Sequence, residues 1–378
     1  MGPKRNNISH FQTPSLLPSG IRCEFRHFLK RKAFKKWLYK TIQILVLLPV
    51  LPFYLLEKII LNLDEGVSWF LCAAVKGISL CGEYRPEAVY STGGTASAHL
   101  AGFIVSRYTS IPWIAEFQDP LIHDDWLGSK REYLFANWLE KLVCKNASAV
   151  IFLTEAAKES SRKRTGLGNK GHVIYPGSGT ELFPKVIYRK RSAFHFAHFG
   201  SLAGSRNPEV FFEALYQFLL SEPQLRNIIK VDLYGTCDNR THNLIRHFEY
   251  RDVIAYHGKL PRNKSLSLMA ASDCLLLIQN TQAFSSETIP SKVYEYLFTN
   301  RPVLGLVHKN PELEQMLLNQ GHWVALADDV ESVLKGMKSI ISRFHINDNQ
   351  ENFPEPLWTI EKAVSRLITI AEVLHLEK

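Results

Sequence analysis

The sequence predicts an α/β protein with two doubly wound lobes in succession, the first of them truncated or rebuilt. Strand-like and helix-like segments alternate from about residue 86 to residue 175, become irregular, and alternate again from residue 194 onward. This alternation is typical of βαβ units around a parallel sheet. The chain has 378 residues, of which 46% are hydrophobic, and this size accommodates two ordinary domains with cores of their own.

In the first lobe, short runs rich in β-branched and aromatic residues separate segments in which apolar residues have helical spacing. The strands are expected at 88–92, 112–117, 149–153 and 173–175. The helices are expected at 95–108, 130–145 and 155–164. From 184 to 192 the chain is polar and basic and has no periodicity, so we expect the connection between the lobes there.

The second lobe repeats the pattern and adds helix-start signals. Its strands are expected at 194–199, 231–234, 253–256, 274–279 and 302–307. Its helices are expected after Asn207 and Pro208, over 263–272, and from Pro290. Asn is a favoured N-cap, and Pro suits the first helical position because that position needs no N–H. A last helix over 359–374 follows two prolines and could pack anywhere, including back on the first lobe.

Basic residues are concentrated at the N-terminus. Residues 1–40 hold ten Lys or Arg and one acid, Glu24, whereas the rest of the chain has 35 basic and 35 acidic residues. Between Arg22 and Lys40 the basic residues interleave with aromatic and leucine side chains, a mixture that suits an anionic membrane surface. A nucleic-acid contact and a merely solvated segment are the alternatives. Because the body is neutral and lacks a basic stripe, nucleic acid is not expected as a partner.

A mostly apolar run of 15 residues, 42–56, follows this basic arm and contains Pro49 and Pro52. A transmembrane helix needs about 20 apolar residues, and two prolines would interrupt its hydrogen bonds inside lipid. The long positive region and the lack of a clear cleavage pattern also argue against a signal peptide. We therefore expect residues 22–60 to form a peripheral contact with the cytoplasmic face of a membrane. The alternative for the apolar run is a buried core helix of the first lobe.

Two glutamates, Glu287 and Glu295, stand eight positions apart where a predicted buried strand gives way to a loop and a helix. The spacing alone decides nothing, because Glu57 and Glu65 share it, so the context must decide. The first N–H groups of a helix are unpaired and lie at the positive end of its dipole, which suits a diphosphate. A carboxylate can accept hydrogen bonds from sugar hydroxyls. A nucleotide sugar needs both features; the alternative is a solvated helix face that carries two glutamates.

Two segments of the first lobe add to this motif: Tyr90-Ser-Thr-Gly-Gly94 with Ser97-Ala-His-Leu-Ala-Gly102, and Ile111-Pro-Trp-Ile-Ala-Glu-Phe-Gln-Asp-Pro120. Over roughly residues 62–376, this order of motifs resembles the family-4 glycosyltransferases, and most closely the bacterial members that build cell-surface polysaccharide. The resemblance implies the GT-B fold, in which two Rossmann-like lobes face each other across a cleft. It also implies retaining transfer of a sugar from a nucleotide-diphosphate sugar to a glycan or lipid-linked acceptor.

By this resemblance, Glu287 would contact hydroxyl groups of the donor sugar, and Glu295 would contact the ribose of the nucleotide. The backbone of Thr288, Ile289 and Pro290 would contact the diphosphate. The family needs no metal, so no cofactor is expected. The chain agrees with this, because it has no Asp-x-Asp motif, and its six scattered cysteines form no Cys-x-x-Cys pair that would indicate zinc. The cysteine pattern also indicates no disulfide framework, as in a reducing cytosol.

The loop that begins at Phe199 and contains Gly200 resembles the family's phosphate-facing turn, in which two basic residues usually neutralise charge on the leaving diphosphate. Arg206 takes the second basic position, but Ser201 stands where many members have arginine. Either Arg206 and Lys292 share the task, or the leaving group is stabilised less. Losing one such group typically costs about a hundredfold or more in rate. The alternative for Arg206 is a surface salt bridge.

In the first lobe, Asp119 follows a predicted strand at the edge where parallel sheets bind ligands, and it is a candidate for contact with the acceptor. Related sequences tend to read Arg-Asp-Pro-Trp here, whereas this chain reads Gln118-Asp-Pro-Leu121. His99, on the preceding predicted helix, is another candidate. A lone histidine on a largely apolar helix is, however, more often structural.

The expected organisation has four parts. They are a basic arm with an apolar segment (1–62), a partial acceptor lobe (63–185), a donor lobe (194–345) and a C-terminal helix (354–376). Family members open with a strand, a glycine-rich turn and further elements of the acceptor lobe, and none of these is visible in residues 1–62, so that lobe looks incomplete. Two alternatives to an active transferase follow: an inactive protein that still binds a nucleotide sugar, and a sugar-nucleotide epimerase on the same fold.

Overall fold

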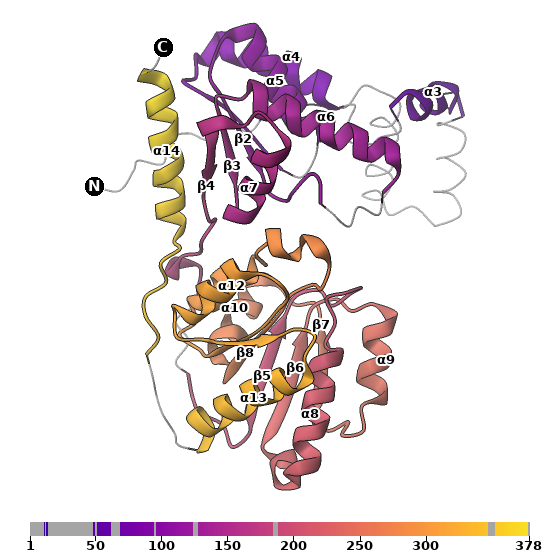
Figure 1. The fold of residues 1–378 in the computed structure, drawn as a ribbon, viewed down its shortest axis with the longest axis vertical. Helices are drawn as coiled ribbons and strands as arrows, with labels where there is room; N and C mark the ends of the chain where they lie inside the picture. The colour runs from indigo at the N-terminus through magenta and orange to yellow at the C-terminus, as the bar shows by residue number, and fades with distance from the viewer. Residues whose placement is uncertain are drawn as a thin grey trace.

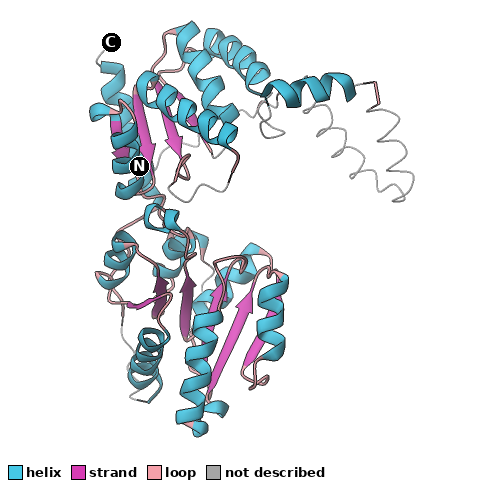
Figure 2. Ribbon diagram, turned by 45° about the vertical axis from the view of Figure 1, so that its right-hand side comes forward, coloured by secondary structure: helices cyan, strands magenta, loops and turns pink. Residues whose placement is uncertain are grey.

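The computed structural model describes residues 11, 13, 48–49, 51–61, 69–93, 96–123, 128–183, 188–346 and 352–376. Within these residues the chain forms two lobes, one above the other in Figure 1, and each is built around a parallel sheet. Figure 2 shows helices flanking the strands in both lobes. The predicted α/β class with two Rossmann-like lobes is confirmed. The first sheet is the smaller, with four strands against six.

The first sheet has the strand order β1-β2-β3-β4, and all of its pairs are parallel. Its strands are Val89–Thr92 (β1), Trp113–Phe117 (β2), Ala149–Phe152 (β3) and Gly171–Val173 (β4). Its helices are Trp69–Tyr84 (α4), Ala96–Thr109 (α5), Lys130–Asn146 (α6) and Glu155–Arg164 (α7). The predictions for β1 to β3 are confirmed to within one residue, but β4 begins two residues earlier than predicted. The sequence did not predict α4, whose small buried residues Ala74 and Cys81 pack with Ala101 and Val105 of α5.

The two faces of the first sheet have different partners. Trp113 of β2 and Leu139 of α6 share the core on one face. Ile114, the next residue of β2, points to the other face and packs with Ile370 of α14 (Ile360–Leu376). The last helix of the chain therefore covers the sheet of the first lobe, as Figure 1 shows.

The chain crosses between the lobes twice, and the two crossings touch. The Ser178 N–H donates to the Trp358 carbonyl at 3.2 Å, and the Ile360 N–H donates to the Ser178 carbonyl at 3.0 Å. Gly177 has a φ of +68°, and a Cβ there would lie 2.6 Å from the carbonyl carbon of Thr359. Only glycine fits such a close approach in that conformation.

The second sheet has the order β10-β9-β8-β5-β6-β7. The strands β6 and β7 follow β5 on one side, and β9 and β10 follow β8 on the other, so the strand order reverses between β5 and β8. Its strands are Phe194–Phe199 (β5), Ile229–Tyr234 (β6), Ile254–Gly258 (β7), Cys274–Ile278 (β8), Val303–Val307 (β9) and Trp323–Leu326 (β10). Its helices are Glu209–Ser221 (α8), Asn239–His247 (α9), Arg262–Ala271 (α10), Lys292–Leu297 (α11), Pro311–Leu318 (α12) and Val330–Ile341 (α13). The loops after β5 and β8 diverge where the order reverses. That crevice is the usual ligand position in open α/β sheets.

Two helix starts in this lobe differ from the sequence prediction. α8 begins at Glu209 with Pro208 as its cap, and the Asn207 side chain accepts from the Glu209 N–H at 3.1 Å. α11 begins at Lys292, two residues after Pro290, and has only six residues. The N-terminal dipole that we expected beside the diphosphate is therefore that of a very short helix, and its contribution is small.

Among the described residues, no helix is both long enough and apolar enough to cross a membrane. α3 (Leu51–Leu61) projects from the side of the first lobe in Figure 1. Its residues Leu51, Phe53, Leu55 and Leu56 are between 45% and 65% exposed. The basic residues 22–40, for which we predict a membrane contact, lie outside the described part of the chain.

Candidate active site

A pocket of about 440 Å³ lies in the second lobe, at the carboxyl ends of the strands where their order reverses. The turn after β5, the connection after β7 and the beginnings of α10 and α11 form its walls. Its lining includes Gly200, Ser201, Lys259, Arg262, Lys292 and Glu295. Three cations and one acid line this space, so the pocket favours an anionic ligand.

Two glycines shape the turn after β5. A Cβ on Gly235 would lie 1.8 Å from the carbonyl oxygen of Gly200, and Gly235 has a φ of +131°. The Gly200 N–H donates to the Tyr234 carbonyl at 2.9 Å. The turn is thus pressed against the end of β6, and it holds the predicted phosphate contacts Gly200 and Ser201 at the pocket wall.

Glu295 lies in the pocket wall, where two cations already bind its carboxylate. One oxygen lies 2.6 Å from the guanidinium of Arg262, and the other lies 2.5 Å from the ammonium of Lys292. The Glu295 side chain is 9% exposed, whereas the Arg262 side chain is 62% exposed and has room to swing away. The sequence singled out Glu295 and Lys292 but missed Arg262, because the first position of α10 approaches Glu295 only in the folded lobe.

Arg206 is partly buried beside the same turn. Burial lowers the pKa of its guanidinium. Its Nε is buried, and no hydrogen-bond partner for that atom lies among the described residues. Ser201, at the position where the resemblance leads us to expect a basic residue, is exposed. Arg206 is therefore held close to the turn, and the described part of the chain forms no salt bridge with it, which was the alternative role that we considered.

The loop that carries Glu287 is anchored by two buried amide side chains. The Asn310 amide donates to the carbonyls of Ser285 and Thr288 at 2.7 and 2.9 Å. The Gln279 amide donates to the same Ser285 carbonyl at 2.7 Å. The Thr288 N–H donates to Ser285 as well, at 3.4 Å, and is therefore engaged inside the loop. Of the predicted backbone contacts to a diphosphate, Pro290 has no N–H to offer.

Glu287 faces the first lobe rather than the large pocket. Its carboxylate accepts from the Ser160 hydroxyl of α7 at 2.6 Å, and its carbonyl accepts from the Thr154 hydroxyl at 2.7 Å. Thr154 also caps α7 by accepting from the Ala157 N–H. Glu287 and Asp119 both line a small cavity of about 30 Å³ between the lobes, which has room for little more than water. The donor-side and acceptor-side candidates thus meet at one junction.

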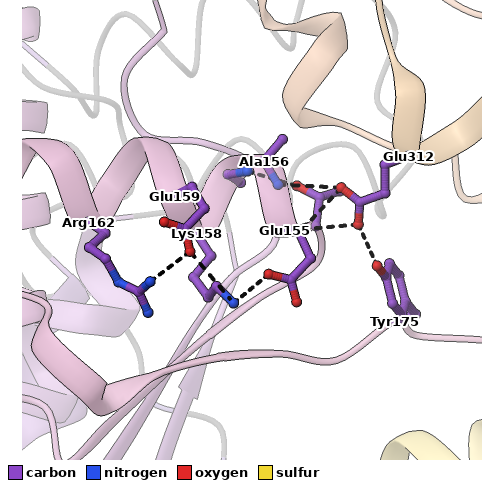
Figure 3. Close-up of polar contacts among 9 residues, drawn as sticks. Glu155, Ala156, Lys158, Glu159, Arg162, Tyr175 and Glu312 are labelled. Carbon is purple, nitrogen blue, oxygen red and sulfur yellow. Dashed lines mark hydrogen bonds and ion pairs between the residues drawn. The ribbon is translucent and has the colours of Figure 1, made fainter.

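A second glutamate of the second lobe reaches the same helix (Figure 3). The carboxylate of Glu312 in α12 accepts from the N–H groups of Glu155 at 3.0 Å and Ala156 at 3.3 Å, at the N-terminus of α7. The hydroxyl of Tyr175 donates to it at 2.5 Å, and burial and this carboxylate raise the pKa of Tyr175. An acid at a helix N-terminus satisfies free N–H groups and the helix dipole. Sequence reasoning missed this contact, because the partners of Glu312 lie 157, 156 and 137 residues away along the chain.

In the first lobe, Asp119 is exposed beyond the end of β2, at the junction. His99 is fully buried, and the Ser91 hydroxyl and the Gly93 carbonyl lie 3.0 and 3.2 Å from its two ring nitrogens. Burial lowers the pKa of His99 to about 4, so its ring is neutral near pH 7. The indole of Trp113 donates to the same Ser91 hydroxyl. This network holds β1, β2 and α5 together, so His99 has a structural position.

Comparison with known proteins gives a fold but no family. No family model matches the chain, and no curated protein matches it. Among solved structures it is similar to HepE of Anabaena in complex with UDP, with a TM-score of 0.58 and 17% identity over 80% of both chains. It is similar to a glycosyltransferase from Rickettsia africae, with a TM-score of 0.60 and 12% identity over 81% of both chains. It is also similar to a protein assigned as a UDP-N-acetylglucosamine 2-epimerase from Listeria monocytogenes, with a TM-score of 0.53 and 13% identity over 82% of this chain and 81% of that one.

These structural similarities show that the chain shares the two-lobe GT-B fold of these proteins. They do not establish membership of family 4, and they leave donor and acceptor open. Fold alone does not determine chemistry, so the residues of the site must carry any functional argument.

Proposed function

We propose that the protein is a retaining glycosyltransferase that moves a sugar from a nucleotide-diphosphate sugar to an acceptor bound between the lobes. One observation carries this proposal. A net positive pocket of about 440 Å³ lies where the strand order reverses, in a fold similar to that of the UDP complex of HepE. The resemblance of the motif around Glu287 and Glu295 to family 4 supports the same assignment.

The nucleotide half of the donor would occupy this pocket. The Gly200 turn lets backbone approach the diphosphate closely, and Arg206 and Lys292 place positive charge beside it. Glu295 would accept hydrogen bonds from the ribose hydroxyls after Arg262 swings toward the ligand. Negative charge grows on the diphosphate as its bond to the sugar breaks, and stabilising that charge is the largest catalytic contribution that we expect.

The sugar half of the donor would lie at the lobe junction. Hydroxyls of the sugar would replace the Ser160 hydroxyl on Glu287, while the segment 288–290 would lie between sugar and diphosphate. Asp119 approaches from the first lobe and would contact the acceptor. The cavity of about 30 Å³ is too small for a hexose, so the lobes must separate to load the donor.

Retention would follow from front-face attack. The acceptor hydroxyl approaches the anomeric carbon from the side of the leaving diphosphate, whose oxygen takes the hydroxyl proton as the old bond breaks and the new one forms. This route needs no covalent enzyme intermediate. Analysis of the anomeric configuration of the product tests it, and an inverted product would contradict it.

The first experiment is thermal unfolding of the wild type and of Glu295→Ala with a panel of nucleoside diphosphates and their sugars. A ligand that binds the native state raises stability by RT ln(1 + [L]/Kd), about 2.7 kcal/mol at a hundredfold excess over Kd. We expect one nucleotide sugar to raise the Tm of the wild type and not that of Glu295→Ala. Glu314→Ala, on the exposed side of α12, is the control and should keep the full shift. If no ligand raises the Tm of a well-folded wild type, the proposal is wrong.

An epimerase is the second candidate, favoured by the similarity to the Listeria protein. The two activities differ in their need for an acceptor. An epimerase would convert the donor that passes the thermal screen with no acceptor present, whereas a transferase would leave it unchanged apart from slow hydrolysis. NMR of the sugar nucleotide after incubation separates them. Binding without either reaction would identify an inactive nucleotide-sugar-binding protein.

We also propose that the protein works as a peripheral protein at the cytoplasmic face of a membrane. The exposed leucines and Phe53 of α3 support this, together with the basic composition of residues 22–40. The full chain should sediment with vesicles that contain anionic lipid, and a chain that begins near Leu63 should not. Equal sedimentation of the two chains would contradict the proposal.

A further inference from the structure

His198, the next-to-last residue of β5, is a buried histidine directly beneath the pocket turn. It is 3% exposed. Its Nδ1 lies 2.9 Å from the carbonyl oxygen of Leu276 in β8. A carbonyl only accepts hydrogen bonds, so the proton of the neutral ring is on Nδ1, and the lone pair is on Nε2.

Nε2 points toward the glycine turn. A Cβ built on Gly200 would lie 3.5 Å from it. Nε2 is buried and has no hydrogen-bond partner among the described residues, and the same holds for Nε of Arg206, which follows in the same loop. Buried polar atoms without partners are uncommon in folded proteins, and each calls for an explanation. Two of them at one turn indicate that the turn serves a ligand.

Burial and the charged groups around the ring explain why it is neutral in the free protein. Burial is the main cause that lowers the pKa of His198 to about 4, and Arg206 from the loop and Lys292 from α11 lower it further because both oppose another positive charge. From β8 the Leu276 carbonyl lies 2.9 Å from Nδ1 of the ring. Tyr296 of α11 contributes a neutral hydroxyl, which accepts a hydrogen bond from the N–H of Phe199 at 2.9 Å. The acid of the pocket wall, Glu295, is already bound to Lys292 and Arg262.

A diphosphate in the pocket would reverse this balance. Its negative charges would offset those of Arg206 and Lys292, and a positive charge behind the turn would then be attracted rather than repelled. This step rests on the proposed function, because it needs a diphosphate beside Gly200. On its exposed side the turn has Ser201, which provides no cation of its own.

We infer that His198 takes up a proton from solvent when a diphosphate binds, and that the resulting imidazolium supplies a further positive charge behind the Gly200 turn. The transfer is a simple protonation of Nε2, while Nδ1–H remains bonded to Leu276. His198 thereby stabilises the bound diphosphate through the turn and acts as an electrostatic partner of Arg206 and Lys292. The affinity for diphosphates is then linked to pH through this one residue.

Calorimetry with UDP and with inorganic pyrophosphate tests this inference. Titrations in buffers of different ionisation enthalpy count the protons taken up on binding. His198→Asn is the matched variant, because its amide N–H can still donate to Leu276 but cannot be protonated. The ligand's own phosphate titrates equally in both proteins, so their difference isolates His198. We expect the wild type to take up as much as about one proton more on binding than His198→Asn does. As the pH rises, the affinity of the wild type should fall by up to about tenfold more per pH unit than that of the variant.

A second variant avoids the core. Ser201→Arg adds a cation on the exposed side of the turn, so it should bind UDP more tightly and take up fewer protons than the wild type. This variant remains informative if His198→Asn does not fold.

The outcomes separate the inference from the proposed function. If UDP or pyrophosphate binds with the same proton uptake in wild type and His198→Asn, or in wild type and Ser201→Arg, the inference is wrong and the proposed function stands. If a well-folded wild type binds neither ligand, both are wrong. A smaller proton uptake than in the wild type, in each variant that folds, supports the inference. Each such variant should also unfold at the same temperature as the wild type.

Discussion

Glu295 and Glu287 are close in sequence, yet their side chains meet opposite surroundings. Glu295 lies in the wall of an open pocket of about 440 Å³, formed within one lobe, and the other charged residues of its lining are three cations. Glu287 lies at a cavity of about 30 Å³ between the lobes, where its carboxylate binds Ser160 of the first lobe. The nucleotide end of the candidate site is thus formed in a single lobe, whereas the sugar end depends on how two lobes meet.

This difference suggests an order of events. On the proposed function, a nucleotide would enter the pocket without moving the first lobe, but a sugar would reach Glu287 only after the hydrogen bonds from Ser160 and Thr154 have opened. The two ends can be separated experimentally by variants that affect nucleotide binding, lobe contact or catalysis. The following predictions use that separation, from the largest expected effect to the smallest.

Removal of the partly buried guanidinium of Arg206 should have the largest effect. Arg206→Ala should lower the rate of transfer by about a hundredfold or more, because charge on the leaving diphosphate loses a principal partner. Steady-state kinetics with the donor identified by the thermal screen measures this loss. Arg240→Ala, which breaks an exposed pair with Glu209, is the control and should keep nearly full activity. A rate for Arg206→Ala close to that of the control would show that the pocket is not the site of the leaving group.

The two glutamates should separate binding from turnover. Glu295→Gln should weaken UDP binding by about tenfold or more, as expected for the loss of a charged hydrogen-bond acceptor. Glu287→Gln should leave UDP affinity unchanged and lower the rate with the complete nucleotide sugar. Calorimetry with UDP and kinetics with the donor provide the two measurements. Equal losses of UDP affinity in both variants would contradict the assignment of Glu295 to the nucleotide end and Glu287 to the sugar end.

Thr154→Val tests the lobe junction. It removes both the N-cap of α7 and the hydrogen bond to the Glu287 carbonyl, so it should lower the free energy of unfolding by about 1–3 kcal/mol. UDP affinity should not change. Urea unfolding measures the loss, with Thr369→Val on the exposed side of α14 as the control, for which we expect less than about 0.5 kcal/mol. A loss no larger than in the control would mean that the junction contributes little to stability.

Glu312→Gln should have the smallest effect. The amide can still accept from an N–H of α7, but the negative charge at the helix N-terminus is lost, which should cost about 0.3–1 kcal/mol and less at high salt. Urea unfolding at low and high ionic strength measures this. Glu314→Gln on the same helix is the exposed control. If salt has the same effect on both variants, Glu312 does not stabilise α7 electrostatically.

The sequence predicted much of the fold because its signals are local. The strands β5 and β8 are continuous apolar or aromatic runs, and the loop and helix that follow β8 carry the glutamate pair at a recognisable spacing. The reversal of strand order at β5 and β8 brings these local features to one edge. From their positions, Gly200, Ser201, Lys292 and Glu295 were expected around one pocket, and they do line one.

The missed features depend on tertiary contacts. Arg262 looks like an ordinary cation at a helix start until α10 packs beside Glu295. Glu312 looks like a helix-start acid of α12, and nothing nearby in sequence reveals that it binds α7. His198 lies in the run Phe-His-Phe-Ala-His-Phe, where alternation predicts a strand but does not reveal which histidine is beneath the turn. The position of Glu287 at the junction could not be predicted either, because it depends on the relative placement of two lobes.

The paired crossings at Ser178 and Thr359 give the molecule a double-stranded hinge. Two segments hydrogen-bonded side by side restrict twisting between the lobes more than a single linker would. The same topology removes the independence of the first lobe. A fragment that ends after the donor lobe would lack α14 and would expose the isoleucine face of the first sheet to water. Opening of the cleft and integrity of the first lobe therefore depend on the same short stretch of paired backbone.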